Sequence, residues 1–567
     1  MDADLFLQQF GHLAKCEGGI KKLRDVILQL AVRGKLLEQN PSDDPADVLL
    51  KKIEAEKKRL VKEGKIRARE HVPLVKKTDD LFTIPANWAW VSLGNIQVFT
   101  NGFAFKSQDY QDTGVGIVRI GDIVKGNIAS LDMKKVPEHF LETLDKSLQV
   151  RKHDVVIAMS GATTGKIGIN NTDEVFLLNQ RVGKIEPILV NKQYLLSYLE
   201  TKIAENLAKS MGSAIPNLST AQINEIEVPL PPLAEQKRIV AKVDELMALC
   251  DKLEAEQKAQ RTLKTQAVQS TLHHLTSAEN PASFGTSLNI LERTFGNWFD
   301  DLATVKHLRA TILQLAVQGK LVPQNPTDEP ASELLKRIEV EKKRLVKEGK
   351  IKKSSVISDS VPSDSEPFNL PYGWAWSLLC DITLSISDGD HQAPPQADRG
   401  IPFLVISNVR NGTVDTQKAS RFVPESYYEG LDRQRKPEKG DILYTVTGSI
   451  GIPVIVDTED KFCFQRHIAI IKPLDNSDRR YLHLYLKSDL ALEQATKSAT
   501  GIAQLTIPLK SLRSLLVPLP PLAEQKRIVA KVDELMTLCD QLEAHITNAK
   551  TINTHLMDSL IHRIVAR

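Results

Sequence analysis

A heptad pattern of apolar residues is the clearest periodic signal in this chain. After Pro231 and Pro232, apolar side chains recur at steps of four and three residues. Proline is accepted at a helix start, because its missing N–H would be unpaired there. The sequence therefore predicts a long helix that begins near Leu233 and packs along one seam. The seam residues are Ile239, Val243, Leu246, Cys250 and Leu253.

This seam occurs twice. Residues 228–255 recur at 517–544 with 26 of 28 positions identical, and residues 23–66 recur at 308–351 with 33 of 44 identical. The stretches that these flanks enclose share only scattered positions. A chain in which the order flank, core, flank is repeated is expected to fold as two similar halves around a pseudo-two-fold axis. The two seams are expected to pair with each other. The alternative is that each packs on its own core.

The flank 23–66 predicts two further helices. An apolar stripe through Leu23, Ile27 and Leu30 ends at Gly34, a residue type typical of helix C-caps. A second helix is predicted after Asp44, with this acid as its cap and a proline just inside. Its sequence EAEKKRLVKEGK alternates charges at helical spacing, as a solvated face does. A docking surface for a partner is the alternative.

In the two variable cores, 67–227 and 352–516, the apolar residues follow the pattern of β-strands instead of that of helices. Short β-branched runs such as DVVIAM (154–159) and DILYTV (441–446) alternate with turn residues. The fold class is therefore α/β (α+β), with two mixed cores joined by long helices. Each core starts with a Pro-x-x-Trp-Ala-Trp signature, and its tryptophans are expected to anchor the core edge rather than to stack on bases.

Composition narrows the class of protein. The chain has 567 residues and a net charge of +3, and acidic and basic residues are balanced in both cores, so bulk charge does not indicate nucleic acid. Without a long apolar run or a secretory signal, a cytoplasmic protein with no membrane contact is expected. The five cysteines are scattered, which argues against a zinc ribbon or a disulfide framework.

Signatures of catalysis are missing from the sequence. The stretch SGATTGKIG (160–168) is one residue too short for a nucleotide-binding P-loop, and TGSIGIPV (447–454) has no lysine. Such loops still suit a DNA phosphate, because backbone amides alone can bind it. His391 and His467 are isolated, so no metal site is predicted. We expect no catalytic residue and no cofactor on this chain.

Three motifs of the chain are informative when they are taken together: PLPPLAEQKRIVAKVDELM after a variable core, the LQLAVxGKL run and the IPxxWxW signature. In these motifs the chain resembles the specificity subunit of type I restriction–modification systems. The resemblance spans about residues 20 to 565. It implies two target-recognition domains joined by helices in an antiparallel coiled coil, each reading half of a bipartite DNA site. The implied segments are a helical region 1–78, a first domain 79–229, a central helical region 230–364, a second domain 365–518 and a C-terminal helix 519–567.

The resemblance also implies partners. Two methyltransferase subunits, which bind S-adenosylmethionine, dock on the helices, and restriction/translocase subunits join that core. The family's helix-start signature maps to ten residues expected to bind partners: Pro231, Pro232, Leu233, Glu235, Gln236, Pro520, Pro521, Leu522, Glu524 and Gln525.

Candidate DNA contacts are the polar residues that flank the predicted strands. In the first core they are Lys106, Arg119, Lys125, Thr163, Thr164, Lys166, Gln180 and Arg181. In the second core they are His391, Asn408, Arg410, Asn411, Thr447, Ser449, Gln465 and Arg466. A Gln-Arg pair recurs in both cores, and Arg bonds guanine and Gln bonds adenine with two hydrogen bonds each. The alternative for this pair is that it is buried and holds a loop.

Two other classes of protein stay open at this point. A coiled-coil scaffold that binds only proteins explains the repeated flanks, but it gives the two divergent cores no role. A nuclease or methyltransferase needs a motif that the sequence does not contain.

Overall fold

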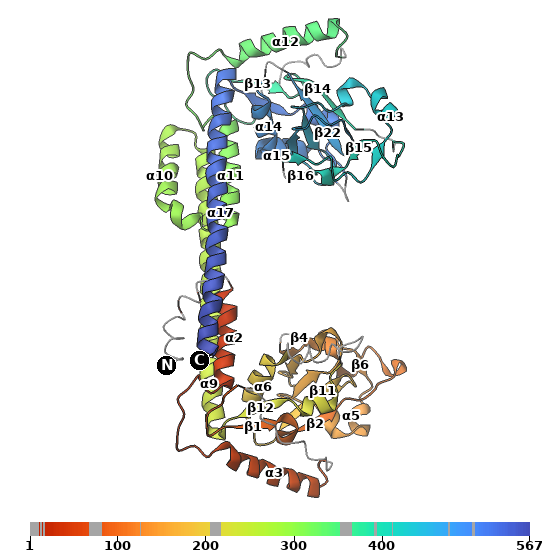
Figure 1. Cartoon of the computed structure of the whole chain (residues 1–567), viewed down its shortest axis with the longest axis vertical. Helices are drawn as coiled ribbons and strands as arrows, with labels where there is room; N and C mark the ends of the chain where they lie inside the picture. Colours follow the sequence, from red (N-terminus) through yellow and green to blue (C-terminus); the bar gives the residue numbers. More distant parts are fainter. Residues whose placement is uncertain are drawn as a thin grey trace. The chain divides into compact units, whose positions relative to one another are not determined.

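The structure, a computed structural model, divides the chain into two compact units (Figure 1). Unit 1 holds Met1–Gln260 and Ala549–Arg567, and unit 2 holds Arg261–Asn548. Each unit contains one variable core, as the repeat predicts, while the boundaries of the five implied segments stay predictions. The described residues are 11, 14, 18–66, 82–124, 126–203, 217–351, 366–389, 394–410, 412–474, 477–501 and 505–566.

Unit 1 combines short strands with helices of very different lengths. Its helices are α2 (Gly19–Val32), α3 (Ala46–Lys62), α4 (Leu93–Ile96), α5 (Phe140–Thr143), α6 (Lys192–Thr201), α8 (Thr220–Asn224) and the first part of α9 (Leu233–Ser277). Its strands are β1 (Ala89–Ser92), β2 (Gln97–Asn101), β3 (Val115–Val118), β4 (Ile123–Val124), β5 (Asn127–Ile128), β6 (Lys135–Val136), β7 (Gln149–Val150), β8 (Val155–Ala158), β9 (Ile167–Ile169), β10 (Phe176–Leu178), β11 (Val182–Pro187) and β12 (Glu227–Leu230).

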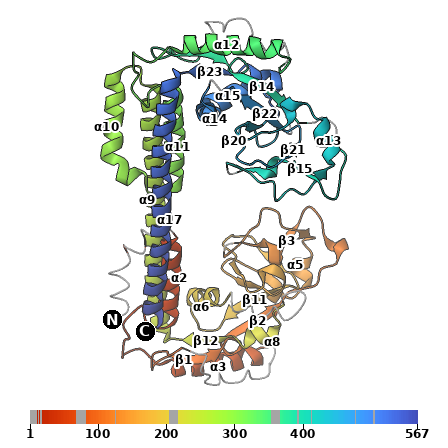
Figure 2. The same cartoon turned by 45° about the horizontal axis from the view of Figure 1, so that its top comes forward.

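The strands of unit 1 form three sheets, with orders β2-β11-β8-β9-β5-β4, β6-β3-β10-β7 and β1-β12. Strand β8 is buried on both faces. Val155 and Ile157 pack in the cluster that includes helix α6, and Val156 and Ala158 pack toward the second sheet. In Figure 2, α6 lies beside β11 and β12. The antiparallel pairing of β1 with β12 brings the two ends of the core together, where the helical flanks attach.

Unit 2 repeats this plan. Its helices are α10 (Pro281–Trp298), α11 (Leu302–Val317), α12 (Ala331–Lys347), α13 (Glu425–Gly430), α14 (Arg479–Lys487), α15 (Asp489–Lys497), α16 (Leu509–Arg513), the last part of α9 and the first part of α17 (Leu522–Ala566). Its strands are β13 (Ala375–Leu378), β14 (Thr383–Asp388), β15 (Ile401–Leu404), β16 (Val409–Arg410), β17 (Thr413–Val414), β18 (Phe422–Val423), β19 (Ile442–Thr445), β20 (Pro453–Ile455), β21 (Cys463–Phe464), β22 (Ile468–Pro473) and β23 (Leu516–Leu519).

The sheets of unit 2 have the orders β14-β22-β19-β20, β18-β15-β21, β16-β17 and β13-β23. Helices α14 and α15 cover one face of the first of these sheets, through Tyr485, Leu486 and Ala491. The pair β13-β23 closes the core as β1-β12 does in unit 1. The prediction of mixed α/β cores attached to long helices is confirmed.

Each unit holds a helical bundle to which α9 and α17 contribute opposite ends. In unit 1, the stripe of α2 packs with Val243 and Cys250 of α9 and with Met557 near the end of α17. In unit 2, the stripe of α11 packs with Val532 of α17 and with Leu272 near the end of α9. Each unit thus packs the first part of one long helix with the last part of the other.

Two expectations about the helices are wrong. The heptad seams do not pair with each other, because each is buried against the preceding flank helix of its own unit, which offers an apolar stripe at matching spacing. Asp44 does not cap α3. Pro45 occupies the N-cap, and the amide of Ala46 donates to Asn87 O at 3.0 Å, so the carboxylate of Asp44 faces Lys52 instead.

The predicted helix bounds are otherwise accurate. Helix α9 begins at Leu233, α2 ends just before Gly34, and Gly34 has a φ of 69° in the left-handed region that favours glycine. Within the described residues, no helix combines the length and apolarity that crossing a membrane requires.

Candidate nucleic-acid interface

The signature at the start of α9 forms a joint between core and flank. Glu235 is fully buried and accepts hydrogen bonds from Trp88 Nε1 at 2.9 Å and from Gln39 Nε2 at 2.7 Å. Gln236 is also fully buried. Its Oε1 accepts from the Asn191 amide at 2.8 Å, and its Nε2 donates to Pro231 O at 2.9 Å. Three separate segments of unit 1 are therefore fastened to one turn of helix.

Unit 2 builds a similar joint, although Trp374 Nε1 is buried there without a hydrogen-bond partner among the described residues. Glu524 accepts from Gln324 Nε2 at 3.2 Å, and Gln525 accepts from the Asp478 amide at 3.1 Å while donating to Pro520 O at 2.9 Å. Burial raises the pKa of Glu235 and of Glu524, although the hydrogen bonds that each accepts work against the shift. The tryptophans act as anchors, as predicted: Trp88 and Trp374 are both buried.

The burial of these side chains corrects the partner-binding prediction. Pro231, Pro232, Glu235 and Gln236, with their counterparts Pro520, Pro521, Glu524 and Gln525, lie inside the joint and have almost no surface left for a partner. Leu233 is 37% exposed and Leu522 is partly buried against the second core. A partner-binding role stays a prediction for these two leucines alone.

Four segments of unit 1 converge beside the Gln-Arg pair. The Phe103 amide donates to Leu178 O at 2.8 Å, the Asn179 amide donates to Val118 O at 3.2 Å, and the Met159 amide donates to Arg181 O at 2.9 Å. The ends of β2, β3, β8 and β10 therefore meet at one edge of the core. We name this edge, made of residues 102–103, 118–119, 160–166 and 179–181, the Gln-Arg edge of unit 1.

The backbone at this edge is tightly packed. A Cβ on Gly102 would lie 1.9 Å from Asn179 O, so only glycine fits there. The Gln180 amide donates to Phe103 O at 2.9 Å, and the Val182 amide donates to Asn179 O at 2.8 Å. The turn is held by its main chain, which leaves the exposed side chains of Gln180 and Arg181 available. The alternative that this pair is buried and holds a loop is wrong for unit 1.

Unit 2 has a corresponding edge, which we name the Gln-Arg edge of unit 2, made of residues 389, 404–405, 447–449 and 465–466. Its Gln-Arg pair is shifted by one residue along the turn, because Gln465 takes the position of Asn179 and Arg466 that of Gln180. The Gln465 amide donates to Leu404 O at 3.1 Å, and the Val446 amide donates to His467 O at 2.9 Å. A Cβ on Gly389 would lie 2.2 Å from Phe464 O and 2.7 Å from Gln465 O, as a Cβ on Gly102 would lie against Leu178 O and Asn179 O in unit 1. Arg466 is exposed and Gln465 is half-buried. The two cores therefore share one backbone frame at this edge.

Three other basic candidates in unit 1 belong to this edge or follow it closely in the sequence. Lys166 is exposed at the start of β9, and Lys106 is exposed three residues after Phe103. Arg119 is half-exposed, and its guanidinium reaches the carboxylate of Asp122 at 3.2 Å. The structure thus gathers several cationic side chains at one edge of a core whose total charge is balanced.

Several predicted contact residues serve the fold instead. Thr164 is 1% exposed and donates to Gly161 O at 2.7 Å, and Thr163 is half-buried with a covered hydroxyl. Asn408 is buried, accepting from the Val405 amide at 3.0 Å and donating to Lys418 O at 3.2 Å. Thr447 is buried, with its Oγ1 3.2 Å from that of Thr506. A hydroxyl or amide covered in this way cannot reach a base.

Ser449 is exposed in the loop after β19, where it stays a candidate. The predictions for Lys125, His391 and Asn411 lie outside the described residues, as does the side chain of Arg410. Sequence reasoning missed Phe103, which is 36% exposed beside the Gln-Arg pair. The only signal that could have found it is the glycine before it, since Gly102 and Gly389 precede the same turn in both cores.

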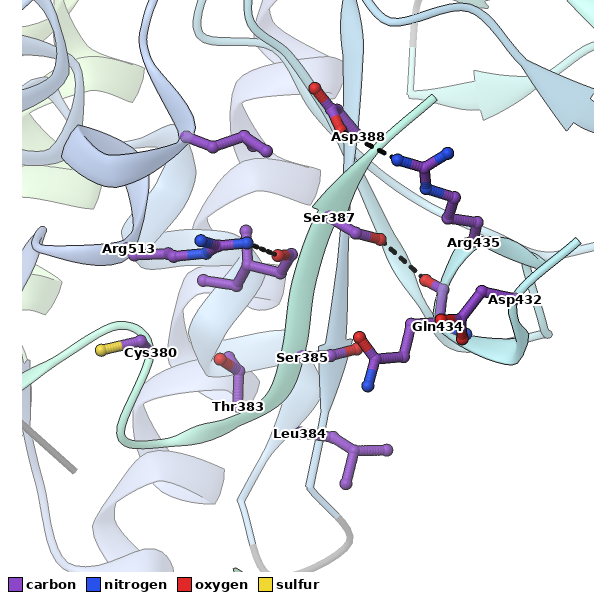
Figure 3. A pocket seen from close by; sticks show the side chains of 12 residues that line it. Cys380, Thr383, Leu384, Ser385, Ser387, Asp388, Asp432, Gln434, Arg435 and Arg513 are labelled. Carbon is purple, nitrogen blue, oxygen red and sulfur yellow. Dashed lines mark hydrogen bonds and ion pairs between the residues drawn. The ribbon is translucent and has the colours of Figure 1, made fainter. Parts of the chain in front are cut away.

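A cavity of about 260 Å³ lies beside strand β14 in unit 2 (Figure 3). Arg513 Nη2 donates to Ile386 O at 2.7 Å and Ser387 Oγ donates to Gln434 O at 2.8 Å, so the lining groups tie β14 to α16 on one side and to the segment around Gln434 on the other. Burial raises the pKa of the Cys380 thiol to about 11, which keeps it protonated at neutral pH. In the part of the chain that the structure describes, no His, Cys, Asp or Glu cluster could hold a metal ion.

Comparison with known proteins decides the family. The family model for the type I restriction modification DNA specificity domain matches residues 85–261 and 396–550, one match for each core with its following helix. The EcoEI specificity subunit of Escherichia coli is 32% identical over 96% of this chain and 93% of its own length. This chain belongs to the type I restriction enzyme specificity subunits.

Other specificity subunits are similar over the same extent. The EcoAI specificity subunit of Escherichia coli is 31% identical, again over 96% of this chain and 93% of its own length. A solved structure of a type I restriction–modification system covers 86% of this chain and 99% of its own, at 19% identity and a TM-score of 0.49. As a specificity subunit, the chain recognises DNA sequence within a type I complex and is not itself the catalyst.

Proposed function

We propose that core 67–227 and core 352–516 of this specificity subunit read the two different halves of one bipartite DNA site. The observation that carries the proposal is the Gln-Arg edge, which has the same backbone frame in both units but different side chains around it. Arg119 follows β3 in unit 1, whereas Val405 follows the equivalent strand β15 in unit 2. A common frame with different surface groups suits two readers of different sequences.

The exposed groups at these edges have the chemistry of base reading. Arg181 and Arg466 can donate two hydrogen bonds to the O6 and N7 of guanine, and Gln180 can bond the N6 and N7 of adenine. Lys106 and Lys166 suit backbone phosphates, whose attraction adds affinity without sequence preference. Because the turns are fixed by main-chain hydrogen bonds, the backbone positions from which Gln180, Arg181 and Arg466 extend are set before DNA binds.

We further propose that the repeated flanks bind two copies of one methyltransferase subunit, which carries S-adenosylmethionine, and that restriction/translocase subunits join this assembly. The support is that the first turns of α9 and α17 carry the same sequence and expose the same lysine in the two units. Leu233 and Lys237 on α9 correspond to Leu522 and Lys526 on α17, and both lysines are exposed. The cytoplasm is the expected site of such an assembly.

Selection of bound duplexes from random-sequence DNA, with the methyltransferase partner present, tests the reading function. The proposal predicts a consensus of two unlike halves separated by an unread spacer. A protein-interaction scaffold, which is the alternative, would return random sequence with or without the partner.

Partner binding is tested by stoichiometry in analytical ultracentrifugation. We expect Lys237→Glu alone to reduce the bound methyltransferase from two copies to one, Lys526→Glu alone to do the same, and the pair to release both. Lys258→Glu, an exposed charge reversal on α9 about six turns beyond Lys237, is the matched control. Two bound copies in the double variant would reject this face as the docking site.

A further inference from the structure

The ring of Phe103 lies at the Gln-Arg edge of unit 1, fixed next to the base-reading turn. Its backbone makes a hydrogen bond on both sides: its amide donates to Leu178 O at 2.8 Å, and its carbonyl accepts from the Gln180 amide at 2.9 Å. Gly102 before it lies against Asn179 O so closely that no side chain fits. The position of Phe103 relative to Gln180 is therefore set by the main chain.

Other aromatic rings support Phe103 from one side. Its ring meets Phe105 edge to face with centroids 5.0 Å apart, and Phe105 meets Phe140 in the same way at 5.5 Å. Phe105 is 9% exposed, whereas Phe103 is 36% exposed. One part of the Phe103 ring thus belongs to the core, and the rest presents an apolar surface among polar and cationic neighbours.

This degree of exposure decides between two kinds of DNA contact. A side chain that wedges between base steps has to project its ring from the protein surface. Phe103 keeps about two thirds of its surface covered and is held by its neighbours, so it suits contact at the groove surface. In the major groove, the apolar group available there is the C5-methyl of thymine, which marks an A·T pair by its position.

We propose that Phe103 contacts the thymine methyl group of one A·T pair in the half-site that core 67–227 reads. The inference rests on the proposed DNA-reading function and adds an apolar reader to the polar Gln-Arg pair. Because Gln180 is joined to Phe103 through the backbone, the thymine is expected at, or one step from, the base pair that Gln180 reads.

The second core provides an internal comparison. Gly389 takes the place of Gly102 against the turn, and the residue that follows it in the sequence is Asp390 rather than an aromatic residue. A carboxylate cannot make this apolar contact. The methyl dependence should therefore be confined to one half of the site.

The test replaces each thymine of the selected duplex by deoxyuridine, one at a time, which removes only the methyl group. With the full chain and its methyltransferase partner, we expect one replacement in the first half-site to weaken binding about fourfold, the effect of about one buried methylene-sized group. In Phe103→Ala, the thymine and uracil duplexes should bind equally well. Phe103→Leu, which keeps an apolar group, should retain part of the difference.

Two results would overturn the inference: no methyl dependence in the first half-site of the unaltered protein, or a dependence that persists in Phe103→Ala. The deoxyuridine scan of the unaltered protein tests for the methyl dependence even if the alanine variant does not fold. Failure of the unaltered protein to select any sequence would instead reject the proposed reading function. Selective binding without methyl dependence would reject only the role of Phe103.

Discussion

Trp88 Nε1 donates a hydrogen bond to the carboxylate of Glu235 at 2.9 Å, across 147 positions of sequence, and so fastens the start of the first core to the first turn of α9. Glu235→Leu removes this acceptor and leaves both Trp88 and Gln39 without a buried partner. We expect unit 1 to lose about 2 kcal/mol of unfolding free energy, because an unpaired buried donor keeps its desolvation cost.

Urea unfolding followed by tryptophan fluorescence measures this loss. Glu235→Gln is the matched control, since its amide oxygen still accepts, and it should cost less than the leucine variant. Equal stability of Glu235→Leu and the unaltered protein would show that the joint contributes nothing to the attachment of the core.

Arg181→Ala should weaken binding to the selected site about tenfold to a hundredfold and relax the preference at one base pair, as expected for loss of a two-bond contact with guanine. Arg151→Ala provides a control with the same loss of charge, because Arg151 precedes the opposite end of β8 from the Gln-Arg edge. Selection and titration with both variants measure the effect. If both variants lost the same affinity, Arg181 would contribute only its positive charge and would not read a base.

His483 on α14 should make the stability of unit 2 depend on pH. Burial, reinforced by the nearby charges of Lys487 and Arg480, lowers the pKa of His483 to about 4, and its Nε2 lies 3.2 Å from Pro453 O. Between about pH 6.5 and pH 4 the unfolded chain binds a proton that the folded chain does not. Stability should therefore fall over this window as pH decreases, by up to about 3 kcal/mol.

Unit 1 indicates which residue can replace His483 in a control variant. Leu196 on α6 occupies the position that matches His483 on α14, and it is buried. His483→Leu should therefore be accommodated, and the difference in unfolding free energy between the two proteins should shift in favour of the variant as pH falls from 7 to 4.5. A difference that stays constant with pH would show that His483 does not titrate in this window.

Much of the helical frame could be predicted from the sequence, because proline, glycine and the heptad spacing act locally. The start of α9 at Leu233 and the burial of Cys250 both follow from such signals. The partner of each seam could not be predicted, since an apolar stripe does not specify which other stripe covers it. Asp44 failed as a cap because a residue distant in sequence, Asn87, satisfies the first helical amide.

The candidate site was predicted in part, for a similar reason. The Gln-Arg pair was found because it recurs in both cores, but its neighbours depend on which strand ends meet in space. Asn408 and Thr164 are polar residues next to strands, and both turn inward to satisfy loop backbone. Phe103 was overlooked because an aromatic residue near a strand is usually part of a core.

The central claim is that each core reads its own half-site independently of the frame that holds it. A chain in which residues 67–227 are replaced by a second copy of residues 352–516 tests this claim directly, because both cores are followed by the same Val-Pro-Leu-Pro-Pro sequence. Selected duplexes should then contain the half-site of the second core twice and the other half-site not at all. If they still contain the half-site of the first core, or a sequence related to neither, the two-reader account is contradicted.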